Sequence, residues 1–193
     1  GGAEADYVAW AKAAGTAAGF TVADAWVETW KEDSSLDVGE VATYCTLTTG
    51  GGDDEQYCIP TTTQNNSILA YITEHAPVTA TPVYAAVLPV STGLSITAAL
   101  AAGYDSSDAA DEVTTSIREV YADTADVNHA GYAIPNSYLQ EALGRCESLA
   151  TWTLTGFEVD GVSYLSTDDM VIPGGGTYYP TLAASDVTIT PEA

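Results

Sequence analysis

The fold of this chain is decided by residues 21–59, which read TVADAWVETWKEDSSLDVGEVATYCTLTTGGGDDEQYCI. Apolar side chains recur in phase in the first part of this stretch, 21–30, at Val22, Trp26 and Trp30. One face of residues 41–49 carries every second side chain, namely Val41, Thr43, Cys45, Leu47 and Thr49. A period of two predicts two β-strands, joined here by a charged turn at 31–39.

A glycine-rich turn at residues 50–53 is predicted to fold the second strand back into a third strand over 56–59. If the turn closes a hairpin over these four residues, Cys45 and Cys58 lie opposite each other, within reach of a cross-strand disulfide. The alternative is a pair of small, half-buried thiols, since cytosolic assembly keeps thiols reduced. With Cys146 the chain has three cysteines, and no C-x2-C spacing of a metal site occurs.

Working outward from this stretch, four segments have the apolar spacing of helices. They are residues 4–14, a short helix capped by Asn65 or Asn66, a long helix capped by Ser106 or Ser107, and a helix that begins at Asn136 or Ser137 and runs through Arg145. The long helix has one continuous apolar face, made of Ala110, Val113, Ile117, Val120 and Tyr121. We expect residues 15–19, with a glycine at each end, to break the first helix.

Further strands are expected over residues 81–89, 94–100, 151–159, 162–165 and 187–189. The order of elements is then αββαβ followed by βααββ. Hairpins in both halves favour an α+β fold of two small mixed modules and argue against a doubly wound sheet. We place the boundary near residues 89–93, with a first module over 1–90 and a second over 91–193 that ends in a strand and a tail.

The charge of the chain is strongly one-sided, with 27 acidic against 4 basic side chains and a formal net charge of −23. Such a surface repels phosphate backbones and anionic lipids, so neither a nucleic acid nor a membrane is expected as partner. No stretch approaches the roughly 20 apolar residues of a membrane-spanning helix. The acidity is typical of proteins from salt-loving organisms, or it is simply a soluble acidic surface. Because the chain opens within a helical pattern and without Met, we expect it to be a piece of a longer protein.

No constellation of residues indicates catalysis. The two histidines are His75, at the end of a short helix, and His129, in a polar loop, and no G-x-S-x-G motif accompanies them. Acidic pairs such as Asp53-Asp54 follow from composition, and the string around them lacks the ligand pattern of a calcium loop. The two triple-glycine runs lack the Lys and Ser or Thr of a phosphate-binding loop. We therefore predict no catalytic residue, no metal, no cofactor and no small-molecule substrate.

The aromatic residues favour assembly over chemistry. Tyr and Trp are the usual anchors of protein contacts, and four of them fall at predicted strand ends or in loops. We predict that these four contribute to an interface: Trp30, Tyr57, Tyr178 and Tyr179.

GGAEADYVAWAKAAG at residues 1–15 contains a G-G, a D-Y and a W-A pair, and Ala25-Trp26-Val27 lies in the next expected strand. With the strings that follow, these resemble the baseplate J-like family, a wedge component of contractile phage tails. Gly39-Glu40-Val41 matches a "G-x-V" strand, and residues 70–80, AYITEHAPVTA, resemble a helix that ends in an R-P-V-T-A phrase. Weaker matches follow at Val83, Ala85 and Pro89, and at Gly131, Ile134, Ser137, Leu139, Ala142 and Leu143. This chain has Ala76 in place of the family's Arg.

The resemblance covers residues 1–165 and falls on the middle and C-terminal part of such proteins. It implies a structural wedge subunit without catalytic residues or cofactor, located in the tail baseplate of the virion and assembled in the host cytoplasm. Its partners would be other baseplate subunits and copies of itself, joined around a central hub and rearranged when the sheath contracts. The family pattern transfers no individual binding residue.

Two alternatives from other classes remain. The first is an acidic hydrolase of a salt-loving organism, which requires a deep pocket with convergent carboxylates of perturbed pKa. The second is a surface adhesin module, which the Thr, Ser and Gly content suggests and which requires a sandwich of strands without helices.

Overall fold

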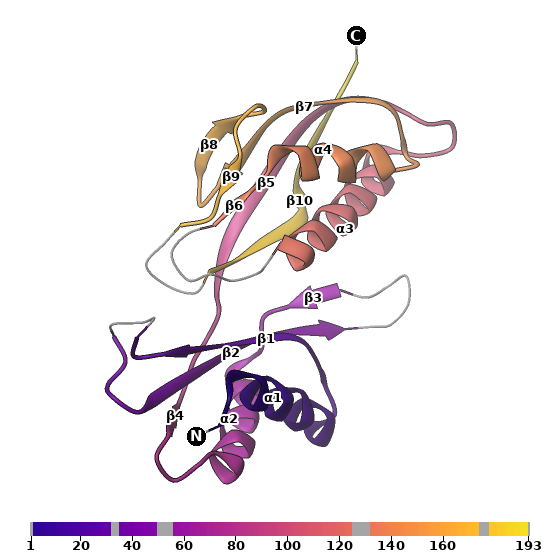
Figure 1. Ribbon diagram of the computed structural model, residues 1–193. Coiled ribbons are helices and arrows are strands. Elements are labelled where there is room, and N and C mark those ends of the chain that lie inside the picture. The colour runs from indigo at the N-terminus through magenta and orange to yellow at the C-terminus, as the bar shows by residue number, and fades with distance from the viewer. Residues whose placement is uncertain (1, 32–34, 50–55, 125–131, 174–177, 193) are drawn as a thin grey trace. The chain divides into compact units, whose positions relative to one another are not determined.

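The computed structural model describes residues 2–31, 35–49, 56–124, 132–173 and 178–192. The chain divides into two compact units, Gly1–Leu88 (unit 1) and Pro89–Ala193 (unit 2), close to the modules expected over 1–90 and 91–193. Each unit combines helices with a sheet of its own (Figure 1), so the predicted α+β fold of small mixed modules is confirmed.

Unit 1 is a small sheet with helices on one face (Figure 1). Its elements are α1 (Glu4–Ala18), β1 (Thr21–Thr29), β2 (Glu40–Thr49), β3 (Gln56–Cys58), α2 (Thr62–His75) and β4 (Thr81–Val83). β1 runs antiparallel to β2, whose other side pairs with β3 at one end and, in parallel, with β4 at the other. The core between helices and sheet contains Ala11, Ala14, Val27, Leu47 and Ile72.

The first helix is longer than predicted. α1 continues through Gly15 to Ala18 and ends at Gly19, whose φ of 82° lies in the left-handed region that glycine adopts readily. Gly15 does not break the helix because its missing side chain has a packing role: a Cβ there would lie 2.9 Å from the Phe20 carbonyl oxygen and 2.9 Å from Val22 Cγ2. The glycine thus lets β1 begin close against the helix.

The second helix begins earlier than predicted, at Thr62, because Thr61 and Gln64 form a capping box at its start. The Thr61 hydroxyl accepts from the Gln64 N–H at 3.4 Å, and Gln64 Oε1 accepts from the Thr61 N–H at 2.8 Å. Asn65, a predicted cap, is instead a buried residue inside the helix.

Cys45 and Cys58 do not lie opposite each other, and of the two alternatives the structure has the pair of free thiols. Cys58 pairs with Leu47 in the β2–β3 register, whereas Cys45 pairs with Ala25 of β1. Both thiols are free. A turn over residues 50–53 would pair Cys58 with Cys45, whereas the observed β2–β3 register pairs it with Leu47, two residues further along β2. Residues 50–55, which connect the two strands, lie outside the described part of the chain.

Unit 2 is a sheet in the order β10-β5-β7-β8, with helices packed on one face (Figure 1). Its elements are β5 (Leu88–Leu100), α3 (Ser106–Thr124), β6 (Ala133–Ile134), α4 (Asn136–Arg145), β7 (Leu149–Val159), β8 (Val162–Leu165), β9 (Met170–Val171) and β10 (Tyr178–Pro191). β5–β7 and β7–β8 are antiparallel. The predicted hairpin 151–159/162–165 is confirmed, with positive φ at both Asp160 and Gly161.

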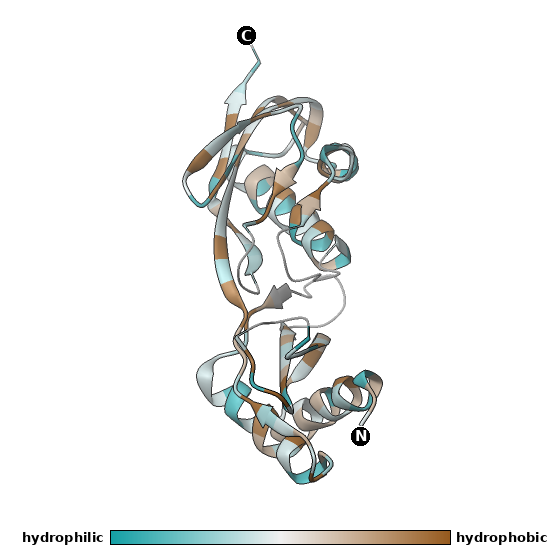
Figure 2. Cartoon of the chain, turned by 60° about the vertical axis from the view of Figure 1, so that its left-hand side comes forward, coloured by the Kyte–Doolittle hydropathy of each residue, from teal (hydrophilic) through white to brown (hydrophobic). Residues whose placement is uncertain are grey.

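The long helix of unit 2 is amphipathic as predicted, with Val113, Ile117, Val120 and Tyr121 buried. Figure 2 shows how hydrophobic and hydrophilic residues alternate along the helices of this unit. The residue that caps the N-terminus of α3 differs from the predicted Ser106 or Ser107. The Asp105 carboxylate caps this helix, accepting from the N–H groups of Ser107 and Asp108 at 2.8 and 3.0 Å.

The edge strand β10 is the largest difference from the sequence prediction, which gave only 187–189. The Thr181 hydroxyl donates to the Val90 carbonyl and the Glu192 N–H donates to the Ala98 carbonyl. The early residue of β10, Thr181, bonds to the early residue of β5, Val90, and Glu192, directly after β10, bonds to the late residue Ala98. The two strands therefore run in the same direction, so β10 is parallel to β5. A parallel partner from the far end of the chain has no local signature in the sequence.

Three smaller predictions were wrong. The strand expected over 81–89 ends at Val83, and the one expected from residue 94 already begins at Leu88. The two-residue strands β6 and β9 pair with each other and were not predicted. Neither Asn136 nor Ser137 caps α4; instead the Asn136 N–H donates to the Asp169 carboxylate at 2.9 Å.

Candidate interaction surfaces

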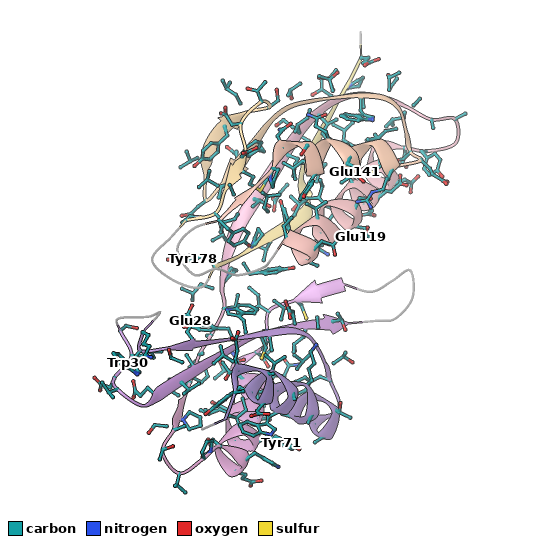
Figure 3. The ribbon with its side chains drawn as sticks, in the orientation of Figure 1. Glu28, Trp30, Tyr71, Glu119, Glu141 and Tyr178 are labelled. Atoms are coloured by element: carbon teal, nitrogen blue, oxygen red, sulfur yellow. The ribbon has the colours of Figure 1, made fainter. Side chains whose placement is uncertain are left out.

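The four predicted interface residues lie in different places. Trp30 follows β1 and is 42% exposed (Figure 3). Tyr57 is in β3, and its side chain lies outside the described part of the structure. Tyr178 begins β10 and is partly buried, whereas Tyr179 is only 4% exposed and offers little surface to a partner. Trp30 and Tyr57 belong to unit 1, and Tyr178 and Tyr179 to unit 2.

Trp30 stands at the rim of a cavity of about 310 Å³ in unit 1. The cavity lies where β1 ends, β2 begins and α1 starts, and its apolar lining comes from Tyr7, Val27 and Val41. Tyr7 is 3% exposed and contacts Trp10 edge-on, with ring centroids 5.0 Å apart. Burial, with a smaller contribution from Asp6, raises the pKa of the Tyr7 phenol, so this wall stays neutral.

The rim of this cavity is polar and carries both signs of charge. Lys31 places its ammonium 5.8 Å from the centre of the Trp30 ring, a cation–π contact. Glu4 and Glu40 add two carboxylates, and Glu40 Oε2 accepts from the Asp37 N–H at 2.8 Å, which fixes that side chain at the start of β2. An apolar floor under a polar rim suits an aromatic or aliphatic side chain with a polar tip.

Four of the five strings of residues 1–90 that resemble the baseplate J-like family contribute to the lining of the cavity, together with Thr29, Trp30 and Lys31, whereas the fifth, at Val83, Ala85 and Pro89, does not. The lining residues that these four strings contribute, in chain order, are Gly2, Glu4, Tyr7, Val27, Gly39, Glu40, Val41, Thr79 and Ala80. The Thr81 N–H donates to the Gly39 carbonyl at 2.8 Å and holds the last two strings together. Sequence reasoning marked Trp30 but missed the cavity, because no local pattern joins four separate segments.

A second cavity, of about 290 Å³, lies in unit 2 between the end of α3 and the side of α4. It is lined by Val120, Asp123, Thr124, Tyr138, Glu141 and Arg145. Glu141 stands on α4 (Figure 3). This lining is mostly polar and brings one guanidinium near two carboxylates, which is typical of a hydrated surface groove.

The groups that sequence reasoning weighed for catalysis do not form a constellation among the described residues. His75 Nδ1 lies 2.7 Å from the Tyr71 carbonyl oxygen, and its ring stacks on Tyr71 with centroids 4.2 Å apart. Both contacts lie within α2, so they account for His75 as a residue that stabilises the end of that helix. His129, Asp53, Asp54 and both triple-glycine runs lie outside the part of the chain that the structure describes.

The thiols are poor nucleophiles. Burial raises the pKa of Cys45 to about 12, with a smaller contribution from Asp24, and burial also raises the pKa values of Cys58 and Cys146. Within the described residues no group of three or more His, Cys, Asp or Glu side chains is placed to hold a metal ion. No helix in that part of the chain is long and apolar enough to cross a membrane.

Comparison with known proteins adds no relative: no protein-family model matches the chain, and no curated protein matches it.

Proposed function

We propose that this chain is a structural subunit of a contractile injection particle, a wedge component of the baseplate of a phage tail or a related machine. In this role it joins neighbouring subunits and copies of itself around a hub and rearranges when the sheath contracts. It acts by protein–protein contact, carries no cofactor, and belongs in the tail baseplate of the assembled virion.

One observation carries this proposal. Four of the strings by which the chain resembles baseplate J-like proteins, spread over residues 1–80, contribute to the lining of one cavity of about 310 Å³. The segments that carry the resemblance thus share one surface of unit 1 that is open to a partner. The half-exposed Trp30 at the rim is the kind of anchor that dominates binding energy at protein interfaces.

The alternatives find less support. A hydrolase of this acidity requires convergent carboxylates in a deep pocket, whereas the Glu40 carboxylate in the cavity is engaged by the Asp37 N–H. The adhesin alternative requires a sandwich without helices, and both units contain helices.

The test is incorporation into a particle. A tagged chain is produced in the cell that encodes it, and sedimented particles are examined for the tag and by electron microscopy. We expect the tag at the tail end of contractile particles. Trp30→Ala removes the rim anchor and is expected to reduce incorporation at least about tenfold, while circular dichroism shows a folded monomer.

Tyr84→Ala is the matched control, since Tyr84 is a comparably exposed aromatic residue of unit 1 (47%) that does not line the cavity. We expect it to be incorporated normally. Absence of the tag from every sedimenting particle, or genes for metabolic enzymes rather than sheath and tube proteins beside the coding sequence, would refute the proposed function.

A further inference from the structure

The sheet of unit 2 has an edge that stops halfway. β8 pairs with β7 only from Gly156 to Val159, whereas β7 begins at Leu149. Along residues 150–155 no strand of the described chain pairs with the side of β7 that faces away from β5. We call this segment the β7 edge. An open edge of this kind presents unpaired N–H and C=O groups to a further strand.

The register identifies which backbone groups face outward. The Ala98 carbonyl accepts from the Glu192 N–H, so Ala98 points toward β10 and its neighbours Thr97 and Ala99 point toward β7. Their antiparallel partners are Thr153 and Thr151, which therefore point back toward β5. It follows that Trp152 and Leu154 direct their N–H and C=O groups to the open side, while Ala150 lies at the register shift between Ala99 and Leu100, where this alternation is interrupted.

The side chains of the β7 edge are uncharged and β-forming. Residues 149–156 read LATWTLTG and contain none of the 27 acidic residues. Thr151 and Thr153 are exposed on the face of the sheet away from the helices, whereas Trp152 packs under α4 near Gly144. A short, uncharged segment rich in β-branched and aromatic residues, without Pro, is the type that adds a strand most readily.

The corresponding edge of unit 1 is protected. β1 is the outer strand of its sheet, and there the Asp24 carboxylate accepts from the Ala25 N–H at 2.8 Å, which occupies an edge amide. Glu28, only 3% exposed, adds a buried acidic residue to the same strand. Charged side chains of this kind are the usual protection of an edge strand, and the β7 edge has none.

We propose that the β7 edge pairs with the β7 edge of a second copy of this chain, antiparallel and about a two-fold axis at Trp152. In this register Trp152 faces its own counterpart, and its outward N–H and C=O groups bond to those of the same residue in the other copy. The threonines then stack across the join, Thr151 of one copy opposite Thr153 of the other.

A second copy is the occupant that the charges favour. A copy carries the same net charge of −23, so it approaches best where a strand has no charged side chain of its own, and residues 149–156 have none, although the Glu192 carboxylate at the end of β10 lies beside Thr151. A cationic partner would instead be drawn to the acidic remainder of the surface. A pair of single strands buries less than the roughly 1,200 Å² of a stable interface, so the dimer is weak and strengthens with salt.

The Glu192 carboxylate makes the pairing sensitive to one position. It accepts from the Thr151 hydroxyl at 2.7 Å and so places a negative charge beside the spot that Thr153 of the other copy occupies. The substitution Thr153→Glu would bring a second negative charge close to this carboxylate across the join, and Thr153→Lys would bring a positive one. Because the dimer is two-fold symmetric, each of these charge contacts occurs twice in it.

The first experiment measures the mass of the full chain by sedimentation equilibrium at about 0.1 and 1 M salt, near which screening becomes strong. We expect a monomer–dimer equilibrium whose dissociation constant falls with salt. Thr153→Glu should raise that constant about fivefold at low salt and Thr153→Lys should lower it about fivefold. Thr188→Glu and Thr188→Lys, on exposed β10, make the same charge changes elsewhere and should alter it little.

The second experiment fixes the register. In a Cys58→Ala background, which removes the less buried native thiol, Thr151→Cys and Thr153→Cys proteins are oxidised separately and as a mixture. We expect a disulfide in the mixture and little in either protein alone, because the proposed register places 151 only opposite 153. Cysteines at Thr188 and Thr190 should not cross-link.

A chain that stays monomeric at every salt concentration, a dimer indifferent to residue 153, or equal cross-linking of all cysteine pairs would each overturn this inference. The inference supplies a self-contact for the proposed assembly but does not depend on it. If the dimer forms but no particle contains the chain, the proposed function is refuted and the β7-edge pairing stands. If particles contain the chain but Thr153→Glu changes neither the dimer nor the incorporation, the β7-edge pairing is refuted and the proposed function stands.

Discussion

The two units attach their helices to their sheets in different ways. In unit 1 the described side-chain hydrogen bonds of α1 and α2 end within the same helix or at its cap, as with Ser67 and the Thr63 carbonyl. These helices are held to the sheet by apolar packing. In unit 2, side chains of α3 bond to the sheet and to the turn before β7.

Three residues of α3 make these bonds. The Arg118 guanidinium donates to the Leu182 carbonyl at 2.9 Å from Nε, which fixes the helix to β10. The Thr92 hydroxyl donates to the Thr181 carbonyl, so the buried Tyr121 hydroxyl, 2.8 Å away, donates to Thr92. The Glu112 carboxylate accepts from two N–H groups ahead of β7.

This difference in how the helices are attached to the sheets determines which kind of surface each unit offers to a partner. Packing alone leaves unit 1 with concave spaces at the margins of its core, including the cavity with Trp30 at its rim. In unit 2, directional bonds fix the helices under the sheet; its cavity of about 290 Å³ has a mostly polar lining, and the uncharged backbone segment open to a partner is the β7 edge. The comparison therefore assigns side-chain docking to unit 1 and strand pairing to unit 2.

The largest expected effect compares one substitution in both cores. Ile117→Ala in α3 and Ile72→Ala in α2 each remove an equally buried side chain, 0% and 1% exposed. We expect a loss of about 4 kcal/mol for Ile117 but only about 2–3 kcal/mol for Ile72, which already borders a small void beside Asn65 and Pro82. Hydrogen exchange resolved by peptide measures each unit separately. Equal losses would remove the contrast in packing between the units.

The next comparison uses two helical glycines with opposite expected signs. Gly15→Ala forces a Cβ against the Phe20 carbonyl and should destabilise unit 1 by about 1–3 kcal/mol. Gly144→Ala meets only Trp152 Cζ2 at an ordinary 3.7 Å, so it should stabilise α4 by up to about 1 kcal/mol. Urea unfolding measures both, and stabilisation by Gly15→Ala would show that β1 does not need the close approach.

The sequence was informative where the signal was local. The apolar period of α3 predicted its buried face, and the Asp160-Gly161 turn predicted the β7–β8 hairpin with its register. The prediction failed where the cause lies far away in the chain: β10 is specified by β5, about 90 residues earlier, and Gly15 is explained only by β1. Of the candidate sites, Trp30 was found as a single residue, whereas the cavity depends on four separate segments.

The smallest expected effect tests the directional bonds of unit 2 through pH. Burial alone would raise the pKa of the Glu112 carboxyl, but hydrogen bonds from Ser148 and Glu147 outweigh it and lower that pKa. A carboxyl whose pKa is lower in the folded than in the unfolded state contributes stability at neutral pH. That contribution is lost as the pH falls through the folded-state pKa.

Glu112→Gln should therefore cost about 0.5–1 kcal/mol at pH 7, because solvent weakens the bonds of this partly exposed carboxylate, and the gap to the unsubstituted chain should close in acid, where the carboxyl is protonated. Urea unfolding between pH 7 and 3 measures this, with Glu119→Gln, an exposed residue of the same helix (Figure 3), as control. If the difference in the free energy of unfolding stays constant with pH, Glu112 contributes through packing of its side chain and not through its charged hydrogen bonds to the turn before β7. The contrast between a packed unit 1 and a hydrogen-bonded unit 2 would then rest on Arg118 and Tyr121.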